Sequence, residues 1–334
     1  MAPNAEVTWS GSLYCLNHEI PVRACYHPAL EMMKNFLLYC SRQEWMKSAV
    51  LKIPLAPRLA RRFMAGETLD DALQVVREVN ALGLTGTIDH LGEHVTDPAE
   101  ARRAVEIYLD ALQRIVDEKL DANVSMKLSE LGQDIDDCIA LENARIILEK
   151  AKHLDVFVRV DMEGSAYTQR TLDAYLNLKS TFENVGIVLQ SYLHRTRKDI
   201  PFLVGQGIRI RLCKGAYDEP STIAYESKTD TDQAYKDEVT MLLESGLYHG
   251  IATHDPVMVD WTLAEMKRLN LEPSAFEFQM LYGVRRDLQT SLREQGYNVR
   301  IYVPFGENWY PYFTRRMAER PANFFFILKN IIKG

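Results

Sequence analysis

Two adjacent arginines near the end of the chain are the first residues whose types and spacing could do chemistry. Arg315 and Arg316 lie in the stretch YFTRRMAERPAN, which we expect to be the last major helix. Paired guanidinium groups can hold a carboxylate through bidentate hydrogen bonds. Taken alone, the stretch favours a different interpretation, a solvated helix face on which Arg315 and Glu319 form an i,i+4 ion pair. The rest of the sequence has to decide between the two.

A repeated pattern of apolar and amphipathic segments predicts the elements that would position these arginines. Eight segments are typical of strands: 84–90, 123–129, 156–162, 185–191, 208–214, 250–255, 276–281 and 300–305. Helical patterns lie between them at 98–119, 138–154, 168–182, 232–248, 255–270 and 285–296. Alternating strands and helices predict an α/β fold with a parallel sheet, and eight units predict a TIM-type (βα)8 barrel over residues 84–334. A doubly wound open sheet is the alternative, although no G-x-G-x-x-G follows the first strand.

The segments outside the strands are assigned more coarsely. Residues 1–29 have the pattern of an irregular leader, and residues 30–83 that of an N-terminal helical segment. Within it, Thr68 is the expected N-cap of a helix, with Asp71 three residues later and Gly83 at its end. The apolar C-terminal stretch NFFFILKNIIKG is expected to dock as a helix on its own domain, with peripheral membrane contact as the alternative.

Polar residues stand at the ends of nearly all the expected strands. They are Asp89 and His90, Lys127, Asp161 and Glu163, Gln190, Arg211 and Lys214, Thr253, His254 and Asp255, Gln279, and Tyr302. In a TIM-type barrel the carboxyl ends of the strands meet at one mouth, where active sites form. Burying so many charges without partners would cost several kcal/mol each, so we predict a functional site there. Its cationic groups and tyrosine favour an anionic ligand or cofactor.

Composition excludes several classes of function. The chain has 334 residues and a formal net charge of −7, which argues against nucleic-acid binding. Its five cysteines are scattered and form no C-x-x-C, a pattern typical of reduced cytosolic thiols rather than disulfides or a zinc site. No run of 18 apolar residues could span a bilayer, and the N-terminus does not resemble an export signal.

Motifs for metal binding and nucleophilic catalysis are weak. His90 and His94 have H-x-x-x-H spacing, but they straddle a strand end and a glycine loop, and that spacing brings two imidazoles together only on a helix. We therefore expect no metal site. No G-x-S-x-G nucleophile elbow occurs. In KGAY, Gly215 would let backbone N–H groups approach a phosphate, which is a weak signal alone.

Seven ordered motifs carry a resemblance to a known family. VSMKLSELG, VRVDMEGS, GIVLQSYL, RLCKGAYDEP, IATHD, FEFQMLYG and RIYVPFG with YFTRRMAERPAN together resemble proline dehydrogenase, from about residue 66 to the C-terminus. The likeness is greatest to the monofunctional bacterial form, because the chain is too short to carry a fused aldehyde dehydrogenase. The resemblance implies a distorted (βα)8 barrel whose last helix lies over the mouth.

The resemblance also implies an activity. Non-covalently bound FAD would accept a hydride from L-proline, giving 1-pyrroline-5-carboxylate in the first step of proline catabolism, and the electrons would pass to a quinone. A separate pyrroline-5-carboxylate dehydrogenase would be a partner. The expected location is cytoplasmic, with peripheral contact at the inner face of the membrane as an option.

Site residues follow from the same motifs. Asp161 and Arg211 would form the catalytic pair, with Arg211 against the flavin. The substrate would be bound by Lys127, Tyr302, Tyr312, Arg315 and Arg316. Glu93 would pair with one arginine as a gate. FAD would be held by Met162, Gln190, Arg211, Lys214, Gly215, Ala216, Thr253, His254 and Gln279.

Two alternative functions stay open at this point. Another flavin-dependent barrel, a hydroxyproline or methylenetetrahydrofolate oxidoreductase, is the alternative enzyme. Tyr302 favours proline, because hydroxyproline enzymes tend to place a smaller residue there, and a folate enzyme has no obvious use for Arg315 and Arg316. From a different class, the chain could be a binding module that senses an amino acid, which the presence of Lys127 and Asp161 disfavours.

Overall fold

The computed structural model describes residues 61–319, with side chains described as far as Arg315. The expected leader over 1–29, most of the expected helical segment over 30–83 and the expected C-terminal docking helix lie outside the described residues. So do the side chains of Arg316 and Glu319.

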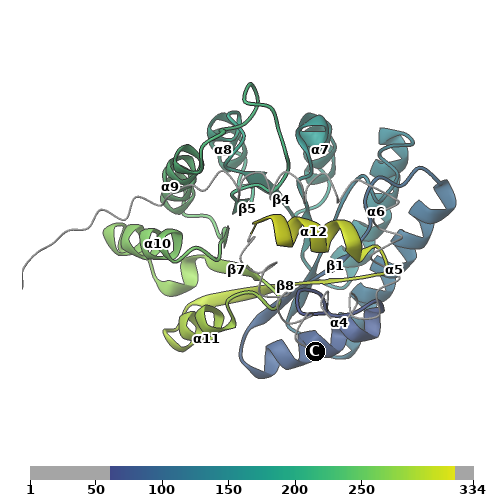
Figure 1. The fold of residues 1–334 in the computed structure, drawn as a ribbon. Coiled ribbons are helices and arrows are strands. Elements are labelled where there is room, and N and C mark those ends of the chain that lie inside the picture. Colours follow the sequence, from purple (N-terminus) through teal and green to yellow (C-terminus); the bar gives the residue numbers. More distant parts are fainter. Residues whose placement is uncertain (1–60, 320–334) are drawn as a thin grey trace, which may run out of the picture.

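The described chain forms a closed barrel of eight parallel strands in sequence order (Figure 1). The strands are β1 Thr85–His90, β2 Ala122–Met126, β3 Val158–Val160, β4 Val185–Gln190, β5 Ile210–Cys213, β6 Gly250–Ala252, β7 Glu277–Leu281 and β8 Asn298–Phe305. Each pairs with its neighbours, and β1 pairs with β8 from Thr85↔Arg300 to His90↔Phe305. The predicted (βα)8 barrel is confirmed, and the open sheet is wrong.

Helices surround this barrel. They are α4 Leu69–Ala81, α5 Pro98–Asp117, α6 Asp137–His153, α7 Ser165–Lys179, α8 Thr196–Val204, α9 Lys228–Glu244, α10 Pro256–Arg268 and α11 Arg286–Glu294, with α12 Trp309–Glu319 after β8. The sequence pattern predicts no helix between 191 and 208, where α8 lies. This helix is short, contains Pro201 and has no side-chain N-cap hydrogen bond, so the usual signals of a helix are missing.

The strands are buried on both faces, as parallel strands in such barrels are. Every residue of β4 is buried, which explains its continuous apolar run Val-Gly-Ile-Val-Leu. Ile88, Val124 and Phe278 are among the side chains with no exposed surface in this core. Close packing on both faces of the strands fixes the positions of the strand ends, and these ends carry the polar residues.

The helix α4 begins and ends as its sequence predicts. The Thr68 hydroxyl accepts a hydrogen bond from the Asp71 N–H, the Asp71 carboxylate accepts one from the Thr68 N–H, and Gly83 follows with a φ of 72°. This helix packs against β1 and β8 on the outside of the barrel. It therefore covers the junction between β1 and β8, where a helix that follows β8 would otherwise pack.

The last helix, α12, crosses the mouth of the barrel instead (Figure 1). Trp309 and Tyr310 in its first turn are 2% exposed, and Phe313 packs against Phe63 with ring centroids 6.3 Å apart. This anchoring holds the first turns of α12 down on the protein. The predicted lid position of the last helix is confirmed.

Candidate active site

A cavity of about 510 Å³ opens at the carboxyl ends of the strands, beneath α12. This volume lies within the range of small-molecule sites. The expected site residues that line it are Glu93, Lys127, Asp161, Met162, Gln190, Arg211, Lys214, Gly215, Ala216, Thr253, His254, Gln279, Tyr302, Tyr312 and Arg315. The carboxyl ends of the barrel strands thus bring together residues that lie more than 200 positions apart in the sequence.

Asp161 stands at the centre of a hydrogen-bond network in this cavity. Its Oδ1 accepts from Nη1 of Arg211 at 2.7 Å and from the Ser125 hydroxyl at 2.8 Å. Its Oδ2 accepts from the Tyr302 hydroxyl at 2.8 Å. The Arg211 guanidinium also lies 5.3 Å from the centre of the Tyr302 ring. Carboxylate, guanidinium and phenol therefore hold one another in fixed positions.

The Arg211 guanidinium has hydrogen-bond donors that this network does not use. Its Nε donates to the Gln279 side chain, whereas its buried Nη2 has no hydrogen-bond partner among residues 61–315. A buried N–H of a charged group without a partner costs several kcal/mol. This geometry fits an acceptor atom of a bound molecule.

A second buried ion pair lies beside the first. Lys127 Nζ donates to Asp89 Oδ1 at 2.6 Å, and both side chains are nearly inaccessible. Burial raises the pKa of Asp89 to about 7, with Lys127 acting in the opposite direction. Burial alone would lower the pKa of Lys127, but the carboxylates of Asp89 and Asp161 raise it above its usual value. Lys127 is therefore held as a cation that faces the cavity.

Arg315 brings α12 into contact with the mouth. Its Nη1 and Nη2 donate to the two carboxylate oxygens of Glu93 at 3.0 and 2.6 Å. Its guanidinium also lies 5.6 Å from the ring centre of Tyr217. With 15% of its side chain exposed, Arg315 does not belong to a solvated helix face. Although burial would raise the pKa of Glu93, Arg315 and Lys127 lower it below its usual value, so Glu93 stays ionised.

The part of the cavity around Lys214 offers an ammonium group to a ligand. Lys214 Nζ donates to Asp232 at 2.5 Å and to Asp255 at 2.9 Å, and its third donor is available to a ligand. Gly215 has a φ of 110°, and a Cβ there would come within 2.1 Å of the Tyr192 ring. Glycine is therefore required for the close packing of this loop. Apolar side chains of Met162, Val188 and Leu281 also line the cavity.

Several lining residues were not assigned a role from the sequence. Asp89 was recognised only as a polar strand end, and its pairing with Lys127 needs the barrel register to be seen. Tyr217 lies in the KGAY motif, where an aromatic residue gives no signal of its own. Lys228 lies in the first turn of α9, away from every strand end. The described residues contain no group of three or more histidine, cysteine or acidic side chains that could hold a metal ion.

Glu163 provides a stability prediction at the edge of the site. It accepts hydrogen bonds from the hydroxyl and N–H of Ser129, and burial raises its pKa to about 7. Between its unfolded pKa and pH 7, the folded protein holds a proton that the unfolded chain releases, so stability falls as pH rises. Glu163→Gln is expected to remove this fall, leaving the variant about 3 kcal/mol more stable than the parent at pH 8, since one pKa unit corresponds to about 1.4 kcal/mol. The free energy of urea unfolding from pH 5 to 8 measures it, and parallel curves for the two proteins would contradict it.

Comparison with known proteins shows the family to which the chain belongs. The family model described as "Proline dehydrogenase" matches residues 72–327. The chain is 41% identical over 274 residues to Proline dehydrogenase 1 of Bacillus subtilis (strain 168), covering 82% of this chain and 91% of that protein.

The chain belongs to the proline dehydrogenase family.

Other members show how far this likeness extends. Proline dehydrogenase of Deinococcus radiodurans is 41% identical over 281 residues, covering 83% of this chain and 91% of the relative. The Bifunctional protein PutA of Escherichia coli (strain K12) is 26% identical over 324 residues, which are 24% of its own length. The protein is thus an enzyme, an oxidoreductase of the proline dehydrogenase family, and it shares most of its length with the shorter members.

A solved structure supports the fold. Proline utilization A from Bdellovibrio bacteriovorus, inactivated by N-propargylglycine, superposes with a TM-score of 0.75 at 24% identity. The match covers 87% of this chain and 36% of that one. This chain therefore shares its fold with part of that protein.

Proposed function

We propose that the protein catalyses the first step of proline catabolism, the FAD-dependent oxidation of L-proline to 1-pyrroline-5-carboxylate. One observation carries the proposal: the buried network of Asp161, Arg211 and Tyr302 under a helix that brings Arg315 to the cavity. The network supplies fixed polar groups to a small substrate, and the lid supplies a cation for its carboxylate. Family membership supports the choice of proline.

The cationic groups would bind the proline carboxylate. Lys127 is held charged in the cavity wall, and Arg315 presents a planar fork suited to a carboxylate. Arg316, adjacent on α12, is proposed as the second arginine of this clamp. Anchoring the carboxylate fixes the ring, so that the reacting C–H is held in one orientation. Tyr302 and Tyr312 would pack against the ring, and Tyr302 would leave less room for a ring hydroxyl.

Glu93 would act as a gate. It pairs with Arg315 through both carboxylate oxygens, so it competes with a substrate carboxylate for the same guanidinium. Exchange of one carboxylate partner for another would let α12 open and close without leaving the Arg315 charge unpaired. Since both partners are less than one fifth exposed, an unpaired state would be costly.

The residues also fit FAD, bound without a covalent link. When bound, FAD supplies the acceptor for the hydride that leaves the ring carbon. Arg211, with a buried Nη2 that lacks a partner in the described chain, would donate to the flavin ring and tune its electronics. The other FAD-binding residues would be Met162, Gln190, Lys214, Gly215, Ala216, Thr253, His254 and Gln279. Their positions around one cavity support this assignment.

The electron acceptor, partner and location follow from the same proposal. We infer a quinone as the acceptor and a separate pyrroline-5-carboxylate dehydrogenase as the enzyme that takes the product. Within residues 61–319, no helix is long and apolar enough to cross a membrane. A cytoplasmic protein with peripheral contact at the inner membrane face would meet a membrane quinone.

Product analysis tests the proposed function. Purified protein reconstituted with FAD is expected to convert L-proline to 1-pyrroline-5-carboxylate in the presence of a soluble quinone. Hydroxyproline is expected to react at least tenfold more slowly, because Tyr302 would occupy the space of the hydroxyl. A tenfold change in rate corresponds to about 1.4 kcal/mol in the activation barrier. Equal rates with both substrates would contradict the role of Tyr302, and the absence of product would contradict the function.

A further inference from the structure

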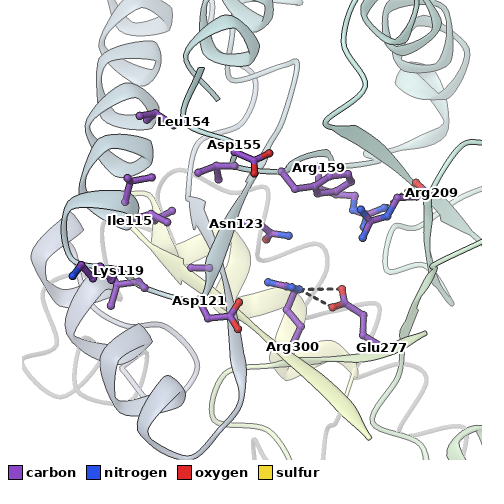
Figure 2. Close-up of a pocket in the computed structure, with 15 residues that line it drawn as sticks. Ile115, Lys119, Asp121, Asn123, Leu154, Asp155, Arg159, Arg209, Glu277 and Arg300 are labelled. Carbon is purple, nitrogen blue, oxygen red and sulfur yellow. Dashed lines mark hydrogen bonds and ion pairs between the residues drawn. The ribbon is translucent and has the colours of Figure 1, made fainter. Parts of the chain in front are cut away.

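The opposite end of the barrel holds a second cavity. It has a volume of about 280 Å³ and lies at the amino ends of the strands, beside the turns that precede β2 and β3 (Figure 2). Three arginines line it: Arg159 on β3, Arg209 just before β5 and Arg300 on β8. None of them lines the active-site cavity. We call this place the floor cavity.

The arginines of the floor cavity have unused hydrogen-bond donors. Arg159 is only 2% exposed, and within the described chain it donates solely through Nη1, to the main-chain oxygens of Arg209 at 3.0 Å and Ile187 at 3.3 Å. Its buried Nε has no partner there. Arg209 donates through Nε to the Tyr248 carbonyl at 3.3 Å. A guanidinium has five N–H donors, so most of those on Arg159 and Arg209 remain available.

Positive charge exceeds negative charge inside the floor cavity. Its buried carboxylate, Glu277, pairs with Arg300 at 3.0 Å through both oxygens, as Figure 2 shows. Arg159 and Arg209 have no carboxylate partner in the part of the chain that the structure describes, and both lie over the Phe157 ring, at 4.9 and 4.5 Å. Two neighbouring cations, Arg159 buried and Arg209 half-buried, favour the binding of an anion.

Burial, together with this excess of charge, shifts the pKa of two titratable groups. Burial lowers the pKa of Arg159 to about 9, and the nearby guanidiniums of Arg211 and Arg209 add to the effect against the opposing charge of Glu277. Burial and Arg159 likewise lower the pKa of His249 to about 4, so that this imidazole is neutral. The neighbouring guanidiniums thus act on both groups in the same direction as burial.

A neutral donor completes the arrangement. Asn123 on β2 is 6% exposed, and its Oδ1 accepts from the Thr87 hydroxyl at 2.6 Å. Its amide nitrogen is therefore left to donate elsewhere, and Figure 2 shows it pointing toward the arginines. Asp121 and Asp155 stand at the exposed rim together with Lys119, where water and salt weaken the effect of their charges without removing it.

We propose that the floor cavity binds a small tetrahedral oxyanion of the phosphate type. A dianion balances the two guanidiniums that lack carboxylate partners, and its oxygens match the planar donor forks of arginine. Arg159 lies on β3, Arg300 on β8 and Asn123 on β2, and Arg209 lies in the turn just before β5. The bound anion would therefore link the amino ends of several strands. This end of the barrel is remote from the active site and is associated with stability in this fold.

Calorimetric titration of the FAD-loaded enzyme with inorganic phosphate, at constant ionic strength set with chloride, tests the proposal. Saturable binding of one phosphate per chain is expected. Saturation separates a site from the general stabilising effect of phosphate salts, which does not saturate. Sulfate is expected to compete and acetate is not. Heats that match those of chloride, or equal competition by acetate, would overturn the assignment to a tetrahedral oxyanion.

Three variants test whether phosphate binds in the floor cavity. Arg209→Gln keeps a stem over Phe157 but removes the charge, and it is expected to weaken phosphate binding at least tenfold. Asp121→Asn removes a rim carboxylate and is expected to tighten it severalfold. Arg145→Gln, at an exposed arginine of α6 that contacts Asn177, is the matched control and should leave it unchanged. If Arg209→Gln binds phosphate as tightly as Arg145→Gln, the proposal is wrong; if Arg209→Gln fails to fold, the sign of the Asp121→Asn effect decides.

Discussion

Asp161→Asn is expected to lower kcat/KM for L-proline by about two to three orders of magnitude. The substitution keeps the shape of the side chain but removes the charge that holds Arg211 and Tyr302 in place. Removing one positioned electrostatic group from an active site typically lowers the rate by about two to three orders of magnitude. Steady-state kinetics with L-proline and a quinone measures this effect.

Controls separate this loss from damage to the fold. Asp117→Asn removes an exposed carboxylate that accepts a hydrogen bond from Gln113 and should leave kcat/KM unchanged. Flavin content and circular dichroism of Asp161→Asn report whether the barrel and its cofactor persist. An Asp161→Asn enzyme with intact flavin and a kcat/KM within threefold of the parent would remove Asp161 from the catalytic network.

Arg315→Met is expected to raise KM for L-proline by about a hundredfold while FAD stays bound. The substitution keeps an unbranched side chain on α12 and removes the guanidinium that would hold the substrate carboxylate. Each hydrogen bond to a charged group contributes about 1.5–3 kcal/mol, and two such bonds account for the size of the effect. Initial rates over a wide range of proline concentration measure KM, with Arg145→Met as the control for loss of an exposed arginine.

Glu93→Gln separates the two roles of Arg315. If Arg315 serves only to pair with Glu93, the two variants should raise KM alike. If Arg315 binds the substrate, Glu93→Gln frees its guanidinium and should raise KM far less than Arg315→Met does. Equal effects of the two variants would therefore reduce Arg315 to a structural role in the lid.

Much of the fold could be predicted from the sequence, because its signals are local. Each strand is a short apolar run bounded by loops, and the caps of α4 at Thr68 and Gly83 are encoded within a few residues. The short helix α8 was not predicted, because Pro201 lies inside it and no side chain caps its start. Local propensity gives no reason to expect a helix there, so its packing in the barrel must favour it.

The site was predictable in its membership but not in its pairing. Polar residues at strand ends could be assigned to one mouth, since parallel strands of a barrel place these ends together. The partner of each charge depends on register and rotamers, which the sequence does not reveal. Asp89 thus lacked an assigned role until its pairing with Lys127 was seen, and Arg315 could be placed opposite Glu93 only by the family resemblance. Arg159 gave no signal because a single arginine inside a strand resembles a structural ion pair.

Anaerobic mixing of the FAD-loaded protein with L-proline is the most direct test of the central claim, that this mouth oxidises proline with a bound flavin. The visible absorbance of oxidised flavin is expected to bleach within the enzyme's turnover time and to release one 1-pyrroline-5-carboxylate per flavin. Hydroxyproline should bleach it more slowly, and amino acids without a secondary amine should not bleach it. A flavin that stays oxidised with saturating L-proline would contradict the account.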